Sequence, residues 1–284
     1  GRQREGLCMQ VVDPLDDILD LIGDRFHLDL GAYCRARLYR RVMDRLARLG
    51  QSPAAYLDQC RRDPAEQTAL LDSLSVCVSC FFRDPAVFEL IAVRLLPELL
   101  ERRVNEADGL RLWSAGCGGG EEAYSLAMAA AQVVAGARLP VSPAVNVFAT
   151  DIDRDALDRA RAAHYPREHL QEVKLGVLDR CFAPTATGYA VKPEIRELVD
   201  ISVHDLLDAE LPAPAASVCG DFDLILCRNV LMYFKPAVRQ DVLQRLVGNL
   251  HRGGYLVLGN AEPADGAAGL VPVFPRCNIY RKEE

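Results

Sequence analysis

The chain has 284 residues with a formal net charge of −7; half of the residues are hydrophobic and 26% are charged. This composition fits one large domain or two unequal ones with a sizeable core. It argues against nucleic acid as the partner, because phosphate binding needs a basic surface. No apolar run reaches the roughly 20 residues that cross a membrane, and no signal peptide is visible. We therefore expect a cytoplasmic protein that is not inserted in a membrane.

Cysteine and histidine are spread along the chain. The ten cysteines form no compact framework, and they read as reduced, mostly buried thiols. Cys77 and Cys80 make a C-x-x-C pair, for which a redox or zinc half-site is an alternative reading. No second pair or cluster of histidines accompanies it, so we expect no metal site.

The first third of the chain has helical periodicity. Apolar residues recur at a spacing of three or four after Asp13-Pro14, and a second, arginine-rich helix ends at Gly50. Two short helices follow, with Ser52 and Asp63 as cap residues. We expect a small all-α domain over 12–88, then a linker and connecting helix over 89–109.

From residue 110 onward, short apolar strands alternate with helices. This alternation indicates an α/β fold with a mostly parallel sheet, Rossmann-like, closed by an antiparallel pair of strands at its end. The expected strands are 110–116, 145–152, 200–207, 222–229, 253–260 and 274–283. Ligands of such sheets bind beyond the carboxyl ends of the strands. We expect this domain to cover 110–284, with a polar hairpin inserted at 179–202 as a small β-subdomain.

A glycine-rich loop joins the first strand to its helix at Gly116–Gly120. Such a loop lets backbone approach a ligand closely, although a plain tight turn would have the same composition. The P-loop pattern is absent. Glu121 and Glu122 follow directly, where they would repel a pyrophosphate and attract an ammonium and a sulfonium. The loop therefore favours S-adenosylmethionine (SAM) over NAD.

Acidic residues follow the next strands. Asp151 ends the second strand, where a carboxylate can accept both ribose hydroxyls, although strand-end aspartates also serve as helix caps. Asp205 and Leu206 end the third strand, where adenine would lie; a solvated loop residue is the competing reading of Asp205. Arg228 and Asn229 emerge from the most apolar strand on the same side of the sheet.

Taken together, these motifs closely resemble the CheR-type chemotaxis-receptor methyltransferases. The resemblance covers roughly residues 12–282 and is carried by the basic helix RRVMDRLARLG, the segment SCFFRDPAVFE, the loop WSAGCGGGEEAYSLA, the strand FATDID and the block FDLILCRNVLMYF. Members of that family have a helical N-terminal domain and a methyltransferase domain with a β-subdomain. They transfer a methyl group from SAM to glutamate side chains of receptors, leaving S-adenosylhomocysteine (SAH).

The resemblance implies roles for individual residues. Arg83 matches an arginine that reaches the methyl-transfer site, and Tyr233 matches an active-site tyrosine. The cofactor contacts implied by the matching motifs, with the glycine loop, are Cys77, Ser79, Arg83, Gly116, Glu122, Asp151, Asp205, Leu206, Arg228 and Asn229. Without the resemblance, Arg83 would be read as a surface helix arginine and Tyr233 as a core residue.

Three positions depart from the family pattern. Cys77 and Ser79 stand where members usually have asparagine and threonine, and Cys77 cannot replace the hydrogen bonds of an amide. Asn260 lies in a segment that usually reads His-Ser-Glu. These departures bear on cofactor affinity and on the identity of the substrate.

The arginine-rich helix carries a basic stripe at helical spacing, formed by Arg37, Arg41, Arg45 and Arg48. A solvated face is the plain reading; docking of acidic receptor helices is what the family resemblance implies. Only the six residues APTATG separate Phe182 from Tyr189, which resembles members that bind no receptor tail.

The sequence thus predicts a SAM-dependent protein-glutamate O-methyltransferase, monomeric, that reaches the inner membrane through its receptors. Two alternatives stay open. One is a methyltransferase of the same fold acting on another protein or small carboxylate. The other is a weakly catalytic SAM-binding module of a longer signalling protein. The acceptor itself cannot be read from the sequence.

Overall fold

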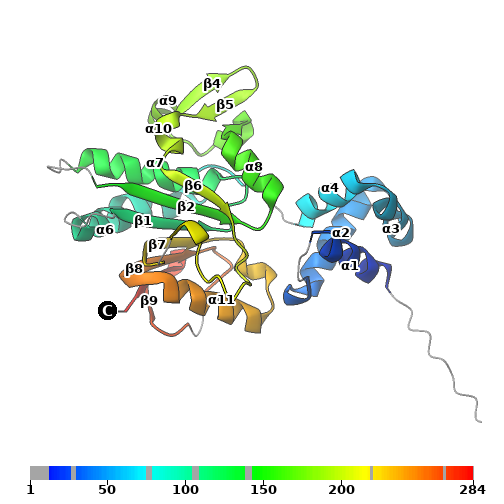
Figure 1. The fold of residues 1–284 in the computed structure, drawn as a ribbon. Coiled ribbons are helices and arrows are strands. Elements are labelled where there is room, and N and C mark those ends of the chain that lie inside the picture. Colours follow the sequence, from blue (N-terminus) through cyan, green and yellow to red (C-terminus); the bar gives the residue numbers. More distant parts are fainter. Residues whose placement is uncertain are drawn as a thin grey trace, which may run out of the picture. The chain divides into compact units, whose positions relative to one another are not determined.

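The computed structural model describes residues 13–26, 30–74, 79–103, 109–137, 143–217, 220–264 and 267–283. The chain divides into two compact units (Figure 1). Unit 1 contains residues 1–77 together with Tyr233–Lys235, and unit 2 contains residues 78–232 and 236–284. The predicted helical part followed by an α/β part is confirmed.

Unit 1 is built of four α-helices and a 3₁₀ turn over its described residues: α1 (Pro14–Phe26), the turn Leu30–Ala32, α2 (Arg35–Leu49), α3 (Pro53–Arg62) and α4 (Pro64–Leu74). The sequence signals at the helix ends act as expected. Gly50 takes a left-handed conformation (φ 65°) that ends α2, and the Ser52 hydroxyl accepts the Ala55 N–H at 3.4 Å to cap α3.

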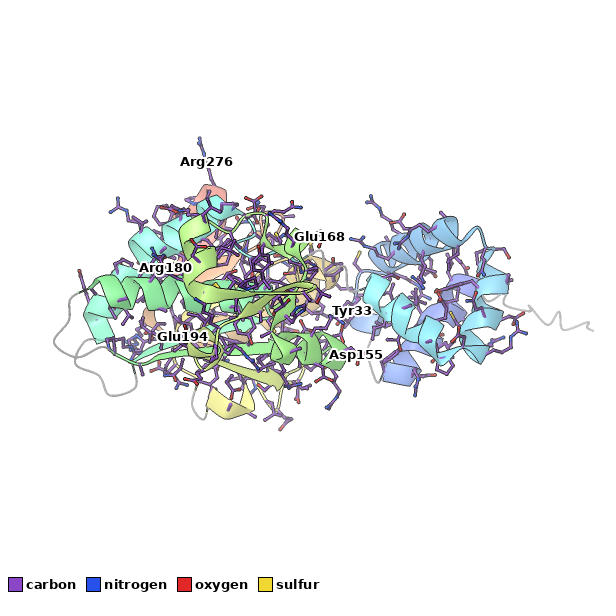
Figure 2. All side chains as sticks on the ribbon, turned by 90° about the horizontal axis from the view of Figure 1, so that it is seen from above. Tyr33, Asp155, Glu168, Arg180, Glu194 and Arg276 are labelled. Carbon is purple, nitrogen blue, oxygen red and sulfur yellow. The ribbon has the colours of Figure 1, made fainter. Side chains whose placement is uncertain are left out.

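The core of unit 1 consists of apolar side chains at helical spacing, including Ile18, Ile22, Val42, Leu46, Tyr56 and Leu70. The segment Tyr233–Lys235 joins this unit through backbone and ring contacts. The Cys34 N–H donates to the Tyr233 carbonyl at 2.6 Å. The rings of Tyr33 (labelled in Figure 2) and Phe234 have centroids 5.0 Å apart. Tyr233, a predicted active-site residue, therefore belongs to the helical unit.

Unit 2 contains a seven-stranded sheet in the order β6-β2-β1-β7-β8-β10-β9. Its strands are β1 (Leu110–Ala115), β2 (Val145–Asp151), β6 (Val199–Val203), β7 (Phe222–Cys227), β8 (Leu250–Leu258), β9 (Leu270–Phe274) and β10 (Ile279–Lys282). The first five in this order are parallel, and β10 pairs antiparallel with both β8 and β9. The predicted antiparallel closing pair is confirmed as β8 with β10, whereas β9 was not predicted.

Helices cover this sheet. They are α5 (Pro85–Leu90), a π-helical turn (Ile91–Leu95), α6 (Leu96–Arg103), α7 (Glu121–Gly136), α8 (Arg154–Ala162) and α11 (Pro236–Asn249), with 3₁₀ turns at Ala215–Ser217 and Pro275–Cys277. A further 3₁₀ turn, Leu231–Tyr233, leads from unit 2 into the segment Tyr233–Lys235 of unit 1. α7 packs on β1 and β2, α8 on β2 and β6, and α11 on β8. Central strand residues such as Trp113 and Ile225 are fully buried. Within the described ranges, no helix is long and apolar enough to cross a membrane.

A second, three-stranded sheet stands apart from the large one (Figure 1). It has the order β3-β5-β4, formed by β3 (His164–Tyr165), β4 (Phe182–Thr185) and β5 (Gly188–Val191), with the 3₁₀ turn Arg167–Leu170, α9 (Leu175–Cys181) and α10 (Pro193–Arg196) beside it. The expected insertion at 179–202 differs from this at both ends. β3 begins earlier, and residues from 199 belong to β6, because a two-residue strand leaves no periodic signal in the sequence.

Candidate active site

The strand order places a topological switch point between β1 and β7 in unit 2. From β1 the chain continues to β2 on one side, and it later returns to β7 on the other side. Loops diverge at such a point and leave a crevice at the carboxyl ends of the strands. The glycine-rich loop follows β1, Asp151 ends β2, and Arg228 and Asn229 follow β7. The predicted residues of these strand ends thus lie along one edge of the sheet.

The glycine-rich loop needs glycine for two reasons. Gly116, Gly118 and Gly120 have φ angles of 79°, 54° and 93°, which side chains other than glycine rarely adopt. A Cβ on Gly116 would also lie 2.4 Å from the Val230 side chain. The resulting turn leads into the N-terminus of α7 through three consecutive residues without side chains, Gly118–Gly120.

Asp151 is held against this loop. Its two carboxylate oxygens accept the N–H groups of Gly118 at 2.8 Å and of Asp153 at 3.0 Å. Burial raises the pKa of Asp151, and these backbone hydrogen bonds oppose the rise. Each oxygen has a second lone pair, so the carboxylate can also accept two hydroxyl groups of a ligand. The alternative reading, a helix cap, applies instead to Asp153, whose side chain accepts the N–H groups of Asp155 and Ala156.

The next strand end holds Asp205 and Leu206. Both are partly buried, and the Asp205 carboxylate accepts the Leu207 N–H at 2.8 Å, which fixes the turn after β6. The preceding residue, His204, is buried against the Trp113 ring, and burial lowers its pKa. The structure therefore puts an ordered carboxylate and an apolar side chain at this strand end.

Arg228 connects three segments that are far apart in the sequence. Its side chain is 1% exposed. It donates to the Glu122 carboxylate at 3.4 Å, to the Arg83 carbonyl at 3.1 Å and to the Asp84 carboxylate. Glu122 also accepts the Ser114 hydroxyl at 2.8 Å. Burial raises the pKa of Glu122, and the positive charge of Arg228 opposes the rise. Arg228 thus ties the Arg83 loop to the first turn of α7.

The Arg83 loop is strained. Phe82 and Asp84 have φ angles of 54° and 60°, a left-handed conformation that costs about 1–3 kcal/mol per residue without glycine. Contacts hold both residues in place: the Phe82 N–H donates to the Ser125 hydroxyl at 2.8 Å, and Asp84 pairs with Arg228. Arg83, between them, is partly buried. Such a shape persists only where its surroundings determine it, which is typical of functional loops.

Glu262 is a buried acid to which the sequence reasoning assigned no role. It is fully buried, and its two carboxylate oxygens accept the N–H groups of Asn229 at 2.7 Å, Gly259 at 2.9 Å and Met232 at 2.9 Å. It thereby shapes the turn after β7, where Asn229 takes a φ of 62°. The signal in the sequence was a lone acid just after an apolar strand. Asn260, the departing residue nearby, is exposed.

Some predicted site residues are not brought to this edge. Cys77 lies outside the described residues, while Ser79 is described and is partly buried. Tyr233 and the arginines of α2 belong to unit 1. Their roles at the active site or in docking therefore stay predictions.

The predicted arginine stripe of α2 does not form a uniform face. Arg45 points into unit 1, where its side chain is 17% exposed and contacts the Glu66 carboxylate at 2.7 Å and the Tyr56 hydroxyl at 2.8 Å. Arg48 is exposed and Arg41 is partly exposed. The side chain of Arg37 is not among those that the structure describes. Arg45 is thus engaged in holding α2 to α3 and α4.

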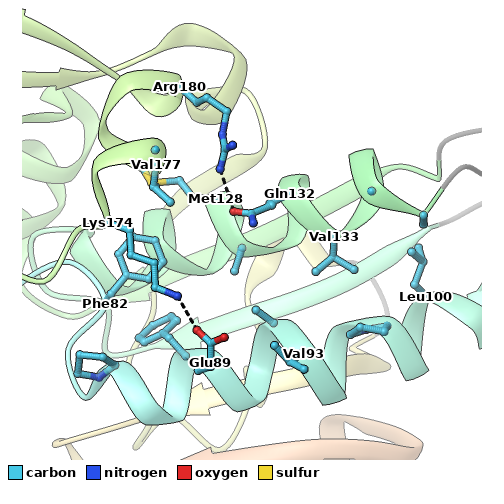
Figure 3. A pocket seen from close by; sticks show the side chains of 18 of the residues that line it. Phe82, Glu89, Val93, Leu100, Met128, Gln132, Val133, Lys174, Val177 and Arg180 are labelled. Carbon is cyan, nitrogen blue, oxygen red and sulfur yellow. Dashed lines mark hydrogen bonds and ion pairs between the residues drawn. The ribbon is translucent and has the colours of Figure 1, made fainter.

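A separate pocket of about 820 Å³ lies between the helices of unit 2 (Figure 3). Its lining is mostly apolar, with Phe82, Met128 and Val177 among its residues. Two polar contacts lie across it, Lys174 to Glu89 at 2.7 Å and Arg180 to Gln132 at 3.2 Å. The strand-end residues described above do not line it, so it is distinct from the edge of the sheet.

Family models match both parts of the chain. "CheR methyltransferase, SAM binding domain" matches residues 78–274, and "CheR methyltransferase, all-alpha domain" matches residues 13–75. The chain belongs to the CheR methyltransferase family. The resemblance read from the sequence is confirmed, and SAM is the cofactor of unit 2.

Curated relatives agree with this family. "Chemotaxis protein methyltransferase 2" of Pseudomonas aeruginosa is 34% identical over 240 residues, covering 83% of this chain and 80% of the relative. "Chemotaxis protein methyltransferase 1" of the same organism is 37% identical over 195 residues, 68% of each chain. The "Chemotaxis protein methyltransferase" of Escherichia coli is 32% identical over 253 residues, covering 86% of this chain and 82% of the relative.

The strand-end residues of this CheR family member fit SAM. The glycines of the loop carry no side chain that would keep a ligand from the loop backbone, and Asp151 keeps lone pairs for a ribose diol. Glu122, Asp151 and Asp205 make the edge acidic, which suits the ammonium and sulfonium groups of SAM better than a pyrophosphate.

Proposed function

We propose that this protein transfers the methyl group of SAM to glutamate side chains of methyl-accepting chemoreceptors, giving glutamate methyl esters and SAH. The similarity to chemotaxis protein methyltransferases supplies the link to chemotaxis. The observation that carries the proposal is the strained Arg83 loop, which Arg228 ties to the first turn of α7. An arginine held beside a cofactor edge is suited to bind an acceptor carboxylate.

The reaction needs little acid–base catalysis. SAM supplies a methyl group on a positively charged sulfur, and a glutamate side chain is already ionised near neutral pH. The protein has to orient the acceptor carboxylate in line and exclude water from it. We assign the orientation to Arg83, whose planar guanidinium matches a carboxylate with two parallel hydrogen bonds. The Tyr233 hydroxyl is proposed to bind one acceptor oxygen.

The cofactor contacts are proposed from the same edge. The residues proposed to contact SAM are Gly116, Glu122, Asp151, Asp205, Leu206, Arg228 and Asn229, together with Cys77, Ser79 and Arg83. Within this set, Arg228 is already engaged with Glu122 and Asp84. We therefore assign to Arg228 the positioning of Glu122 and Asp84. Asp151 is the residue proposed to accept the ribose hydroxyls.

Receptor docking is proposed for the arginines of α2 that remain exposed. Methylation segments of receptors are acidic helices, which a basic helix attracts from solution. Because Arg45 is paired with Glu66, we assign docking to Arg41 and Arg48. The sequence prediction of a docking role for Arg37 is kept. Through these receptors the protein would act at the cytoplasmic face of the inner membrane.

The decisive experiment follows the methyl group. Purified protein is incubated with methyl-labelled SAM and bacterial membranes that contain chemoreceptors, and the label released by base is measured as volatile methanol. A glutamate methyl ester releases it, whereas an N-methyl product does not. Base-labile label that depends on receptors supports the proposal. Label on another protein, or on a small carboxylate, would establish the alternative acceptor, and absence of transfer despite SAH binding would establish the weakly catalytic module.

A further inference from the structure

Gly119, in the middle of the glycine-rich loop, lies close to two side chains that the proposed reaction does not use, Tyr165 and Glu121. The Tyr165 hydroxyl donates to the Gly119 carbonyl at 2.7 Å. On the other side, a Cβ on Gly119 would lie 3.0 Å from the Glu121 carboxylate. Tyr165 and Glu121 are each 3% exposed. The Gly119 peptide therefore accepts a hydrogen bond from one buried side chain and lies close to a second.

Among the described residues, the Glu121 carboxylate is paired with one side chain, that of His169. Its Oε1 lies 2.7 Å from Nδ1 of His169. Its Oε2 is buried and has no hydrogen-bond partner within the described part of the chain. A carboxylate removed from water without a compensating partner is costly. His169 is therefore the group that makes a charged Glu121 tolerable at this position.

Tyr165 and His169 lie on one short segment between α8 and α9, and this segment is itself fixed. The His169 carbonyl accepts the Phe81 N–H at 2.9 Å. The rings of Phe81 and Tyr165 pack edge to face, with centroids 4.8 Å apart. The segment thus contacts the glycine-rich loop on one side and the start of the Arg83 loop on the other.

We propose that Glu121, Tyr165 and His169 form a Gly119 support, a set of positioning residues that sets the affinity of the glycine-rich loop for SAM. The inference rests on the assignment of this loop to the cofactor. Loss of the support would let the Gly119 peptide move, so the loop would have to be ordered again when cofactor binds. The effect should fall on cofactor affinity and on KM for SAM more than on kcat.

The support carries a titratable group. The hydrogen bond with Glu121 raises the pKa of His169 above its usual value of 6.5. The groups that face it are Glu121 from α7, the exposed Glu168 of its own turn (Figure 2), and Tyr165, whose ring centroid lies 6.2 Å from that of His169 and whose pKa burial raises. Because the folded pKa is the higher one, the pairing is complete below pH 6.5 and is lost as pH rises through the raised pKa. SAM affinity should therefore weaken over that interval.

The test measures SAH binding by calorimetry from pH 6 to pH 8.5 on the full chain. At pH 6, His169→Gln should raise the Kd about tenfold, because a buried carboxylate loses its charged partner. The difference from wild type should shrink at pH 8.5. Tyr165→Phe should raise the Kd about threefold at every pH, because one hydrogen bond is lost.

His164→Gln is the matched control, since His164 is an exposed histidine of the same small sheet that bonds Thr185 at 2.7 Å. It should behave as wild type. Wild-type Kd and pH dependence in both His169→Gln and Tyr165→Phe would overturn the Gly119 support. If the wild-type protein binds no SAH, it is the assignment of the loop that fails. A titration of the His169 ring by NMR without cofactor should show the raised pKa independently.

Discussion

Each of the two units contains an arginine paired with acidic residues, and the two arginines have different roles. In unit 1, Arg45 joins α2 to Tyr56 of α3 and Glu66 of α4, all within regular helices. In unit 2, Arg228 joins a strained loop at Arg83–Asp84 to Glu122 on the first turn of α7. The contacts of Arg45 connect helices whose positions are already set by apolar packing. The contacts of Arg228 instead fix the Arg83 loop, whose position apolar packing does not set.

The comparison shows how one kind of contact can have two roles. A buried ion pair adds little net stability over apolar packing, yet removing one partner is costly because the other charge stays buried. In unit 1 the consequence should be a loss of stability alone. In unit 2 the same loss should also change a functional loop. The predictions below test this difference.

Arg228→Gln should have the largest effect. It leaves Glu122 and Asp84 without their cation and should lower the free energy of unfolding by about 3 kcal/mol. The Kd for SAH should rise more than about tenfold, because the Arg83 loop and the first turn of α7 lose their common partner. Denaturant unfolding and calorimetry measure the two effects. Loss of stability with unchanged SAH affinity would make Arg228 an ordinary structural residue like Arg45.

Arg83→Ala should lower methyl transfer about a hundredfold, because the acceptor carboxylate loses the group that orients it. The variant should fold normally, and Arg83→Lys should restore little, since an ammonium cannot form the two parallel hydrogen bonds. Methanol release from labelled receptors measures the rate. Arg94→Ala, at an exposed arginine of the same unit, is the control and should be fully active. Near wild-type turnover of Arg83→Ala would contradict the role of Arg83.

Asp151→Ala should weaken SAH binding by about 1–3 kcal/mol, because two ribose hydroxyls lose a charged acceptor. The variant also frees the Gly118 N–H, so Asp151→Asn serves as the milder comparison. Calorimetry at neutral pH gives both affinities. If neither variant changes the Kd, Asp151 does not contact the ribose.

Arg45→Gln should lower the stability of unit 1 by about 2 kcal/mol without changing SAH affinity. The hydrogen bond from Arg45 lowers the pKa of Glu66 below its usual value of 4.5. The pair therefore stabilises the folded protein above pH 4.5, and this stabilisation is lost as the pH falls through the lowered pKa. The variant should therefore lose part of the acid sensitivity of unfolding. Arg61→Gln, at an arginine whose side chain is 55% exposed, should change stability by less than about 0.5 kcal/mol. A similar cost at both positions would show that the Arg45 pair is not special.

Reversal of Arg41 and Arg48 to glutamate should have the smallest effect on the isolated protein. Stability and SAH affinity should stay near wild type, while receptor methylation falls about tenfold because charge attraction becomes repulsion. Wild-type methylation should weaken with salt, since the screening length falls from about 10 Å at 0.1 M to about 3 Å at 1 M. A receptor tail peptide should not be needed. Salt-insensitive methylation, or tight binding of such a peptide, would contradict docking through α2.

Much of this architecture was predictable because local patterns report it directly. Helical spacing and the caps at Gly50 and Ser52 marked the helices of unit 1, and alternation of strands and helices marked the parallel sheet. The glycine-rich loop and Asp151 could be placed at one edge because the carboxyl ends of parallel strands coincide. The two-residue β3 was missed because it is too short to show a period, and the edge strand β9 was missed because Pro272 lies within it and disfavours a strand reading.

The sequence by itself determined the fold class, the family and which residues gather at the strand ends, because these depend on periodicity and on motifs that are contiguous in the chain. Only the tertiary structure decided what the charged groups contact. It turned Arg45 inward to Glu66, made Arg228 a link between Asp84 and Glu122, and brought His169 to Glu121. Such pairings join residues 21 to 144 positions apart, and no local pattern in the sequence records which charged residue will contact which.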